Sequence, residues 1–89
     1  MRFEWDPKKA KRNLKKHAVS FDEAVTVFYD SLSATFDDPD HSVGEHRYIT
    51  IGFSSRDRLL VVGYTERGEG LRIINVRPAT AHERKRHEG

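Results

Sequence analysis

The sequence predicts a small α+β domain in which an N-terminal strand and two helices pack on an antiparallel sheet and a short helix ends the chain. Three observations lead to this expectation. Two segments near the N-terminus combine helix-capping residues with the helical spacing of apolar side chains. Three later segments rich in Ile, Val and Tyr are separated by turns short enough for hairpins. The chain has 89 residues, enough for one modest core, so we expect residues 1–89 to form a single domain.

The first segment is expected to form a short strand followed by a basic helix. Residues 2–5 alternate aromatic with charged side chains, which is typical of a half-buried strand. Asp6 and Pro7 predict a helix over residues 7–17, because aspartate can cap free N–H groups and proline fits the first helical turn. Lysines and arginines cover most of this helix, and its thin core-facing stripe consists of Ala10, Leu14 and His17.

A second helix is expected over residues 21–29. Ser20 and Glu23 have the spacing of a capping box, in which the serine accepts from the third helical N–H and the glutamate reaches back to the N-cap. The expected core face of this helix consists of Phe21, Ala24, Val25 and Phe28.

The remainder is expected to form an antiparallel meander and a C-terminal helix. A Ser/Thr-rich strand comes first, a loop follows over residues 37–44, and three further strands are joined by short turns. The expected strands are 31–36, 45–53, 58–65 and 71–77. Residues 59–62 are apolar on both faces, so we expect this strand at the centre of the sheet, with the helices on one side. Thr80 is a candidate cap for a basic helix over residues 79–87.

Composition narrows the function classes. The chain has no cysteine, which excludes a disulfide framework and thiolate chemistry and makes the cytoplasm the default location. The longest apolar run, residues 59–64, is far shorter than the ~20 residues needed to span a bilayer. The N-terminus also lacks the apolar core of a signal peptide, so we expect no membrane association.

Charge is laid out in three blocks. Lys and Arg outnumber Asp and Glu by seven to two in residues 1–20 and by nine to five in residues 47–89. Residues 21–46 hold seven acids and no Lys or Arg. Basic segments suit a phosphate backbone, whereas the acidic segment suits a partner-binding edge or balances charge within the fold.

The motifs along the chain resemble those of the BrnT family of type II toxins. Matching residues occur in order and at matching spacing over nearly the whole chain. They are Phe3-x-Trp5-Asp6-x-x-Lys9, Asn13-x-x-Lys16-His17, Phe21-x-x-Ala24, Gly44-Glu45-x-Arg47, Ile51-Gly52, Thr65, Arg72-Ile73-Ile74 and Arg77-x-Ala79-Thr80-x-x-Glu83-Arg84. The sequence departs from the family pattern where Ala18 replaces a usual glycine, where Asn75-Val76 replaces a Ser-Ala pair, and at Pro78.

The resemblance implies a fold and an activity. The fold would be like that of the RelE and barnase-like ribonucleases, with helices on one face of a small sheet and RNA cleaved on the other. The activity would be metal-independent cleavage of RNA, without a cofactor, which inhibits translation and growth until a BrnA-like antitoxin neutralises the toxin. The two proteins would form a hetero-oligomer, for which a dimer of heterodimers is one arrangement. This complex would reach operator DNA only through the antitoxin.

Three arginines are the candidate phosphate ligands of the catalytic site. Metal-free cleavage uses the ribose 2′-OH as nucleophile, so a site needs a proton acceptor, cations for the phosphate and an acid for the leaving oxygen. Arg47, Arg72 and Arg77 lie on expected strands, where an unpaired buried charge is unfavourable, so each should meet solvent, a carboxylate or a phosphate. Surface ion pairs are the alternative role. Arg72 and Arg77 have opposite parity and share a face only if a bulge lies between them.

Proton transfer has three candidates, each with an alternative role. Glu45, beside Arg47 by parity, is the candidate catalytic base or else a salt-bridge partner. His17 is a candidate acid or base, because histidine titrates near neutral pH, or else a packed core residue. His41 is a candidate acid or an exposed loop residue. The basic first helix is expected to steer and bind RNA through Lys8, Lys9, Lys11 and Arg12.

Two alternatives are weighed against this interpretation. The cluster of Asp37, Asp38, Asp40 and His41 has no metal-ligand spacing and lacks the Gly turn and bidentate Glu of a calcium loop, so we expect no metal site. The rival function is a non-catalytic module that binds nucleic acid or protein. A binder loses affinity evenly as cations are removed, whereas an enzyme loses turnover far more than binding when its proton-transfer group goes.

Overall fold

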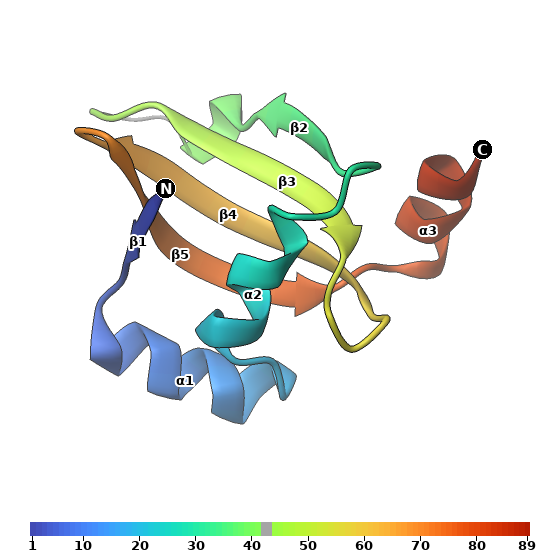
Figure 1. Cartoon of the computed structure of the whole chain (residues 1–89), viewed down its shortest axis with the longest axis horizontal. Coiled ribbons are helices and arrows are strands. Elements are labelled where there is room, and N and C mark those ends of the chain that lie inside the picture. The colour runs from blue at the N-terminus through green and yellow to red at the C-terminus, as the bar shows by residue number, and fades with distance from the viewer. Residues whose placement is uncertain (42–43) are drawn as a thin grey trace.

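The computed structural model describes residues 1–41 and 44–89, apart from the side chain of His41, and these residues form a five-stranded sheet with three α-helices (Figure 1). The elements in chain order are β1 (Arg2–Glu4), α1 (Pro7–His17), α2 (Phe21–Val27), β2 (Ala34–Asp37), the 3-10 helix η1 (Pro39–His41), β3 (Arg47–Phe53), β4 (Leu59–Arg67), β5 (Gly70–Pro78) and α3 (Ala81–Glu88). The α+β class is confirmed, and the first helix has the predicted bounds.

The sheet is mixed, which corrects the prediction of a wholly antiparallel one. Its strand order is β1-β5-β4-β3-β2, so the doubly apolar β4 is central, as predicted. Strands β2 to β5 form the expected antiparallel meander, but β1 pairs in parallel with β5. Parallel neighbours require a long connection, and here it comprises both N-terminal helices and three strands. No local sequence pattern marks such a pairing.

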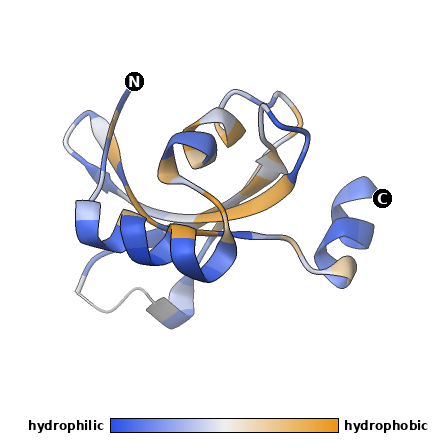
Figure 2. Ribbon diagram, turned by 90° about the horizontal axis from the view of Figure 1, so that it is seen from below, coloured by the Kyte–Doolittle hydropathy of each residue, from blue (hydrophilic) through white to orange (hydrophobic). Residues whose placement is uncertain are grey.

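Helix α2 covers one face of the sheet and builds the main core (Figure 1). Its fully buried side chains Phe21, Ala24 and Val27 pack against Leu60 and Val62 of β4. The remaining members of this cluster are Val19, Ile73 and Val76. Figure 2 shows the strands as largely hydrophobic and the surfaces of α1 and α3 as mostly hydrophilic, so α2 contributes most of the helical apolar surface.

Helix α1 runs along the part of β5 that β1 leaves without a neighbouring strand. Asn13 fastens it there, because its side-chain Nδ2 donates to the carbonyl of Val76 at 2.8 Å and its Oδ1 accepts from the Val76 N–H at 3.1 Å. The same Nδ2 donates to the carbonyl of Val19 at 3.1 Å. The buried residue of α1 is therefore Asn13, and the predicted stripe is wrong at Leu14, which is 52% exposed. The Asn13 side chain is buried here because its amide forms the hydrogen bonds that the open edge of β5 would otherwise lack.

Helix caps follow the sequence with one exception. Asp6 accepts from the N–H of Lys8, and the Ser20 hydroxyl accepts from the N–H of Glu23, as expected. The Glu23 side chain does not return to the N-cap, however. It accepts from Nη2 of Arg58 at 2.5 Å and from the Ser54 hydroxyl at 2.6 Å, and its pKa is lowered chiefly by the Arg58 hydrogen bond. Hydrogen bonds from the charged Arg58 guanidinium stabilise the buried Glu23 carboxylate more than a hydrogen bond from a backbone N–H would.

The departure at Ala18 has a clear backbone consequence. Ala18 ends α1 with φ 57° and ψ 32°, in the left-handed region that glycine adopts at no steric cost. Its N–H still donates to the carbonyl of Leu14 at 2.9 Å, so the helix is closed in the usual way. The family's usual glycine thus fits this position better than the alanine present here.

A β-bulge lies in the middle of β5. The register between β4 and β5 shifts between Gly63 and Tyr64, whose partners are Asn75 and Ile73, so that Ile74 is an extra residue on β5. Side-chain alternation therefore changes phase at Ile74, and residues of opposite parity on either side of it point to the same face.

The C-terminal helix α3 has a full capping box. The Thr80 hydroxyl accepts from the N–H of Glu83 at 3.1 Å, and the Glu83 carboxylate accepts from the N–H of Thr80 at 2.9 Å. The candidate cap at Thr80 is thus confirmed. Within the described ranges, no helix is long and apolar enough to cross a membrane.

Candidate phosphate-binding site

The bulge places the three candidate arginines on the face opposite α2. Arg47 and Arg72 both pair with Thr65, so the two arginines flank this threonine in one cross-strand row. Arg77 pairs with Val61, which lies four residues before Thr65 on β4 and so points to the same side. Arg72 and Arg77 were expected to share a face only if a bulge lies between them. The bulge at Ile74 lies between them, and they share that face.

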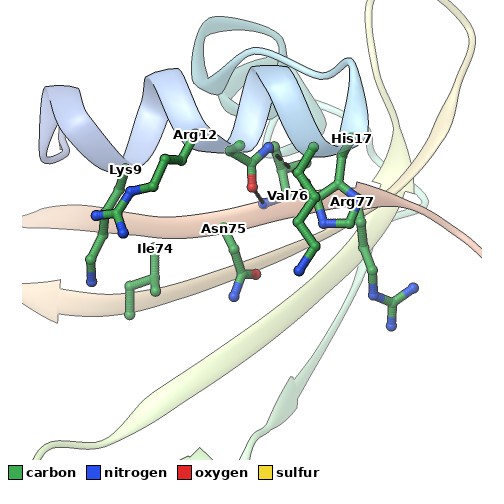
Figure 3. Close-up of a pocket in the computed structure, with 9 residues that line it drawn as sticks. Lys9, Arg12, His17, Ile74, Asn75, Val76 and Arg77 are labelled. Atoms are coloured by element: carbon green, nitrogen blue, oxygen red, sulfur yellow. Dashed lines mark hydrogen bonds between the residues drawn. The ribbon is translucent and has the colours of Figure 1, made fainter.

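A basic cleft lies along the junction of α1 and β5. Its volume is about 330 Å³, and four cationic side chains and one histidine line it (Figure 3). Its lining residues are Lys9, Arg12, Asn13, Lys16, His17, Ile74, Asn75, Val76 and Arg77. None of these nine carries a carboxylate, so the cleft offers a concentrated positive potential. We call it the α1–β5 cleft.

A second hollow opens on the sheet face directly beyond β5. We call it the sheet-face pocket; its volume is about 160 Å³, and Arg47, Asp38 and Arg77 are its charged lining residues. The two hollows share Ile74, Asn75 and Arg77. The bulged strand β5 therefore lies between the cations of α1 on one side and the sheet-face cations Arg47 and Arg77 on the other.

Arg77 is anchored by a two-pronged ion pair with Glu83. Its Nη1 donates to Oε1 at 2.7 Å and its Nη2 donates to Oε2 at 2.9 Å. These hydrogen bonds lower the pKa of Glu83 to about 2 and raise the pKa of Arg77. The Arg77 side chain remains 40% exposed, so the guanidinium is oriented by α3 and still open to a ligand.

The other two arginines have looser carboxylate neighbours. Arg47 lies with Nη2 at 3.8 Å from Oε1 of Glu45, and Arg72 lies with Nη1 at 4.0 Å from Oε2 of Glu4. Pairs at these distances on a half-exposed surface contribute little to stability. The loose pair with Glu4 leaves the Arg72 guanidinium able to exchange its carboxylate for a phosphate.

The structure separates the proton-transfer candidates. His17 is half-buried and lines the α1–β5 cleft together with Arg77. Glu45 precedes β3, beside Arg47, and lines neither hollow. The side chain of His41 lies outside the described residues. The five catalytic candidates therefore do not converge on one point, and His17 is the candidate proton-transfer group that lines a hollow.

The expected RNA-steering residues divide in the same way. Lys9 and Arg12 line the α1–β5 cleft, whereas Lys8 and Lys11 are exposed elsewhere on α1. Lys16 also lines the cleft and was missed, although the spacing of residues 9, 12 and 16 places them on one face of a helix.

Asn75 is the second residue that sequence reasoning missed, although it was noted as a departure from the family pattern. It is exposed between the two hollows, and its side chain lies over Gly63 of the neighbouring strand. A Cβ at Gly63 would come within 2.7 Å of Oδ1 of Asn75, so the glycine makes room for the amide. No local signal links these two residues, because their pairing depends on the bulge.

Two tyrosines that line the sheet-face pocket make structural contacts. Tyr48 and Tyr64 stack on each other with ring centroids 5.4 Å apart, and Tyr64 also packs edge-on against Phe28. The Tyr48 hydroxyl donates to Glu66 at 3.1 Å, which raises the pKa of Tyr48. In the described part of the chain, no group of three or more His, Cys, Asp or Glu side chains is arranged to hold a metal ion.

A small α+β domain with a cationic groove along one strand carries the electrostatic footprint of a nucleic-acid-binding protein. Residues 5–83 match the family described as the ribonuclease toxin BrnT of type II toxin-antitoxin systems, and the chain belongs to this family. The family thus assigns RNA as the substrate and a protein antitoxin as the partner.

A solved structure shows the same fold. The crystal structure of the Brucella abortus ribonuclease toxin BrnT at 1.1 Å resolution superimposes with a TM-score of 0.71 and 23% sequence identity, over 90% of this chain and 97% of that chain. At this identity the likeness extends to the fold alone. No curated protein sequence matches the chain.

Proposed function

We propose that residues 1–89 act as one endoribonuclease domain that binds RNA along the joined α1–β5 cleft and sheet-face pocket and cleaves it without a metal. One observation supports this most strongly. The two hollows share Arg77 and Asn75, so cations from α1 and from the sheet lie along one continuous path. Such a path suits a single strand of RNA, whose phosphates repeat along its length.

The arginines would hold the reacting phosphate. Arg77 enters both hollows and is oriented by Glu83, while Arg47 approaches from two strands away across the same pocket. A planar guanidinium can donate two parallel hydrogen bonds to phosphate oxygens and stabilises the charge that develops on them in the transition state. Arg72, which lies in the same cross-strand row as Arg47, would bind a flanking phosphate, as would the lysines of α1.

His17 is the proposed proton-transfer residue, and Glu45 is the second candidate. The 2′-oxygen attacks phosphorus while its proton passes to the base. The bond from phosphorus to the 5′-oxygen breaks as that oxygen takes up a proton. The products are a 2′,3′-cyclic phosphate and a free 5′-OH. His17 lines the cleft beside Arg77, which places an imidazole next to the proposed phosphate site.

The test is cleavage of RNA by the purified chain in excess EDTA. We expect cleavage to persist, and His17→Ala to lower kcat by about 10²- to 10⁴-fold with little change in KM. His82→Ala is the matched control, since His82 is exposed on α3 and lines neither hollow, and it should cleave like the parent.

The other outcomes are equally informative. If Glu45→Gln loses turnover while His17→Ala keeps it, the base is Glu45. If the folded parent binds RNA without cleaving it in EDTA or in Mg²⁺, the chain is the non-catalytic binding module.

In the cell, we propose that cleavage takes place in the cytoplasm and inhibits translation and growth. A BrnA-like antitoxin would neutralise the toxin in a hetero-oligomer, which reaches operator DNA through the antitoxin. The basic cleft supports an RNA substrate for this chain, because its cations suit a phosphate backbone and its described lining residues include no acid.

A further inference from the structure

An apolar groove lies on the same face of the sheet as the arginines. Its volume is about 540 Å³, and apolar side chains of β2, β3 and β4 form its floor: Ala34, Ile49, Ile51 and Val61. Leu32 and Phe36 form one rim, and Glu83, Arg86 and His87 of α3 form the other. We call it the β2–α3 groove.

The rim next to β2 is unusually apolar for a surface. Leu32 is 76% exposed and Phe36 is 58% exposed, and both lie against a floor that is itself apolar. Contiguous exposed apolar surface of this kind is typical of an interaction site. β2 is also the edge strand on this side of the sheet, so in the described part of the chain no strand pairs with its outer backbone groups, which can accept an added strand.

The rim formed by α3 is basic. Glu83 is engaged by Arg77 and Glu88 by Arg84, so in the described part of the chain the α3 cations that remain for a partner include Lys85 and Arg86. His87 is half-buried and packs its ring against Phe53 at 6.1 Å between centroids, which holds the end of α3 over the groove. An occupant of complementary chemistry would place apolar side chains on the floor and carboxylates toward α3.

The groove is continuous with the candidate site. Ile49 and Val61 line both the groove and the sheet-face pocket. A chain segment lying in the groove would therefore end beside Arg77 and Arg47 and would exclude RNA from them.

We propose that the β2–α3 groove is the docking site of the protein antitoxin, which adds an extended segment beside β2, inserts apolar side chains into the groove and faces α3 with acidic ones. The proposal rests on the type II toxin family for the existence of that partner. It does not depend on which residues cleave RNA. The bound segment inhibits by occupying the approach to the arginines.

The test is a calorimetric titration of the purified full chain with the purified antitoxin of its own toxin-antitoxin pair. We expect Phe36→Glu to raise Kd about 30-fold or more, as for an anchor residue buried at an interface. Arg86→Glu should also weaken binding and reduce its salt dependence. Leu14→Glu is the matched control, because Leu14 is an exposed leucine on α1 outside the groove, and its Kd should stay within about 3-fold of the parent. Circular dichroism and thermal unfolding establish that each variant is folded.

Two results would overturn the proposal. One is an unchanged Kd for Phe36→Glu. The other is a parent chain that dimerises in solution and that Phe36→Glu converts to monomer while its affinity for antitoxin is unchanged, which would make the groove an interface between copies of this chain. RNA cleavage is measured separately. A parent that fails to cleave RNA refutes the proposed function, yet the effect of Phe36→Glu on Kd still decides the docking site.

Discussion

Replacing Asn13 with alanine should destabilise the protein more than alanine at any other position of α1, because Asn13 is the buried residue of this helix. Asn13 is 7% exposed, and its amide makes three hydrogen bonds that join the helix to two backbone segments. Alanine is a better helix former than asparagine, so local propensity favours the variant by a few tenths of a kcal/mol at most. The loss arises entirely from the tertiary contacts.

The size of the stability loss follows from the backbone groups that the substitution leaves without a hydrogen-bond partner. Both Val19 and Val76 are fully buried, so one N–H and two carbonyls would lose their partner away from water. Each buried group left without a partner costs about 1–3 kcal/mol, which at the low end gives about 3 kcal/mol in total. For a domain of this size each kcal/mol lowers Tm by about 4–8 °C, so we expect a fall of about 12–24 °C.

Chemical denaturation followed by circular dichroism measures the free energy of unfolding, and hydrogen exchange reports the Val76 amide directly. That amide should lose its protection in Asn13→Ala. Asn75→Ala is the matched control, one residue along β5 from the anchored Val76, and since Asn75 is exposed it should change stability by less than about 0.5 kcal/mol. A loss below about 1 kcal/mol for Asn13→Ala, or an unchanged exchange rate at Val76, would refute this account of how α1 is held.

Three further predictions follow from the ion pairs and the helix ends. Arg58→Ala should cost about 3–5 kcal/mol in chemical denaturation, because it leaves the Glu23 carboxylate buried, whereas Glu23→Ala should cost less, since the Arg58 side chain is 35% exposed and can turn to water. The pKa of Glu83, about 2, lies below its ordinary value of 4.5, so its contribution to docking α3 is complete above pH 4.5 and is lost as pH falls toward 2. Carboxyl NMR titration measures this, and a midpoint near 4.5 would contradict the Arg77 ion pair. Ala18→Gly should raise the free energy of unfolding by about 0.5–1 kcal/mol by thermal denaturation, because the left-handed strain outweighs the added freedom of the unfolded glycine, and a destabilised variant would show the reverse.

Much of the fold could be predicted from local chemistry. The bounds of α1 follow from a cap, a proline and a run of good helix formers, all within one segment. The central place of β4 follows from apolar side chains on both faces, since only a strand covered on both sides can bury them. The sites of the caps at Asp6, Ser20 and Thr80 are equally local.

Three errors in the fold concern partners distant in sequence. The parallel pairing of β1 joins residues about seventy positions apart, and Glu23 leaves its capping box for Arg58. The local pattern of α1 does not predict that Asn13 is buried, because its partner is the open edge of β5. In each case a strong tertiary contact outweighs a weaker local one.

For the candidate site, residue types and local spacing predict which groups are present: arginines on strands, lysines on one helix and a histidine at its end. The bulge at Ile74 is visible in the folded sheet alone, and it brings Arg72 and Arg77 to the same face. Side-chain direction alternates with every residue of a strand, so one inserted residue reverses the assignment of everything beyond it. A bulge depends on how two strands meet, and the pattern of either strand alone does not contain it.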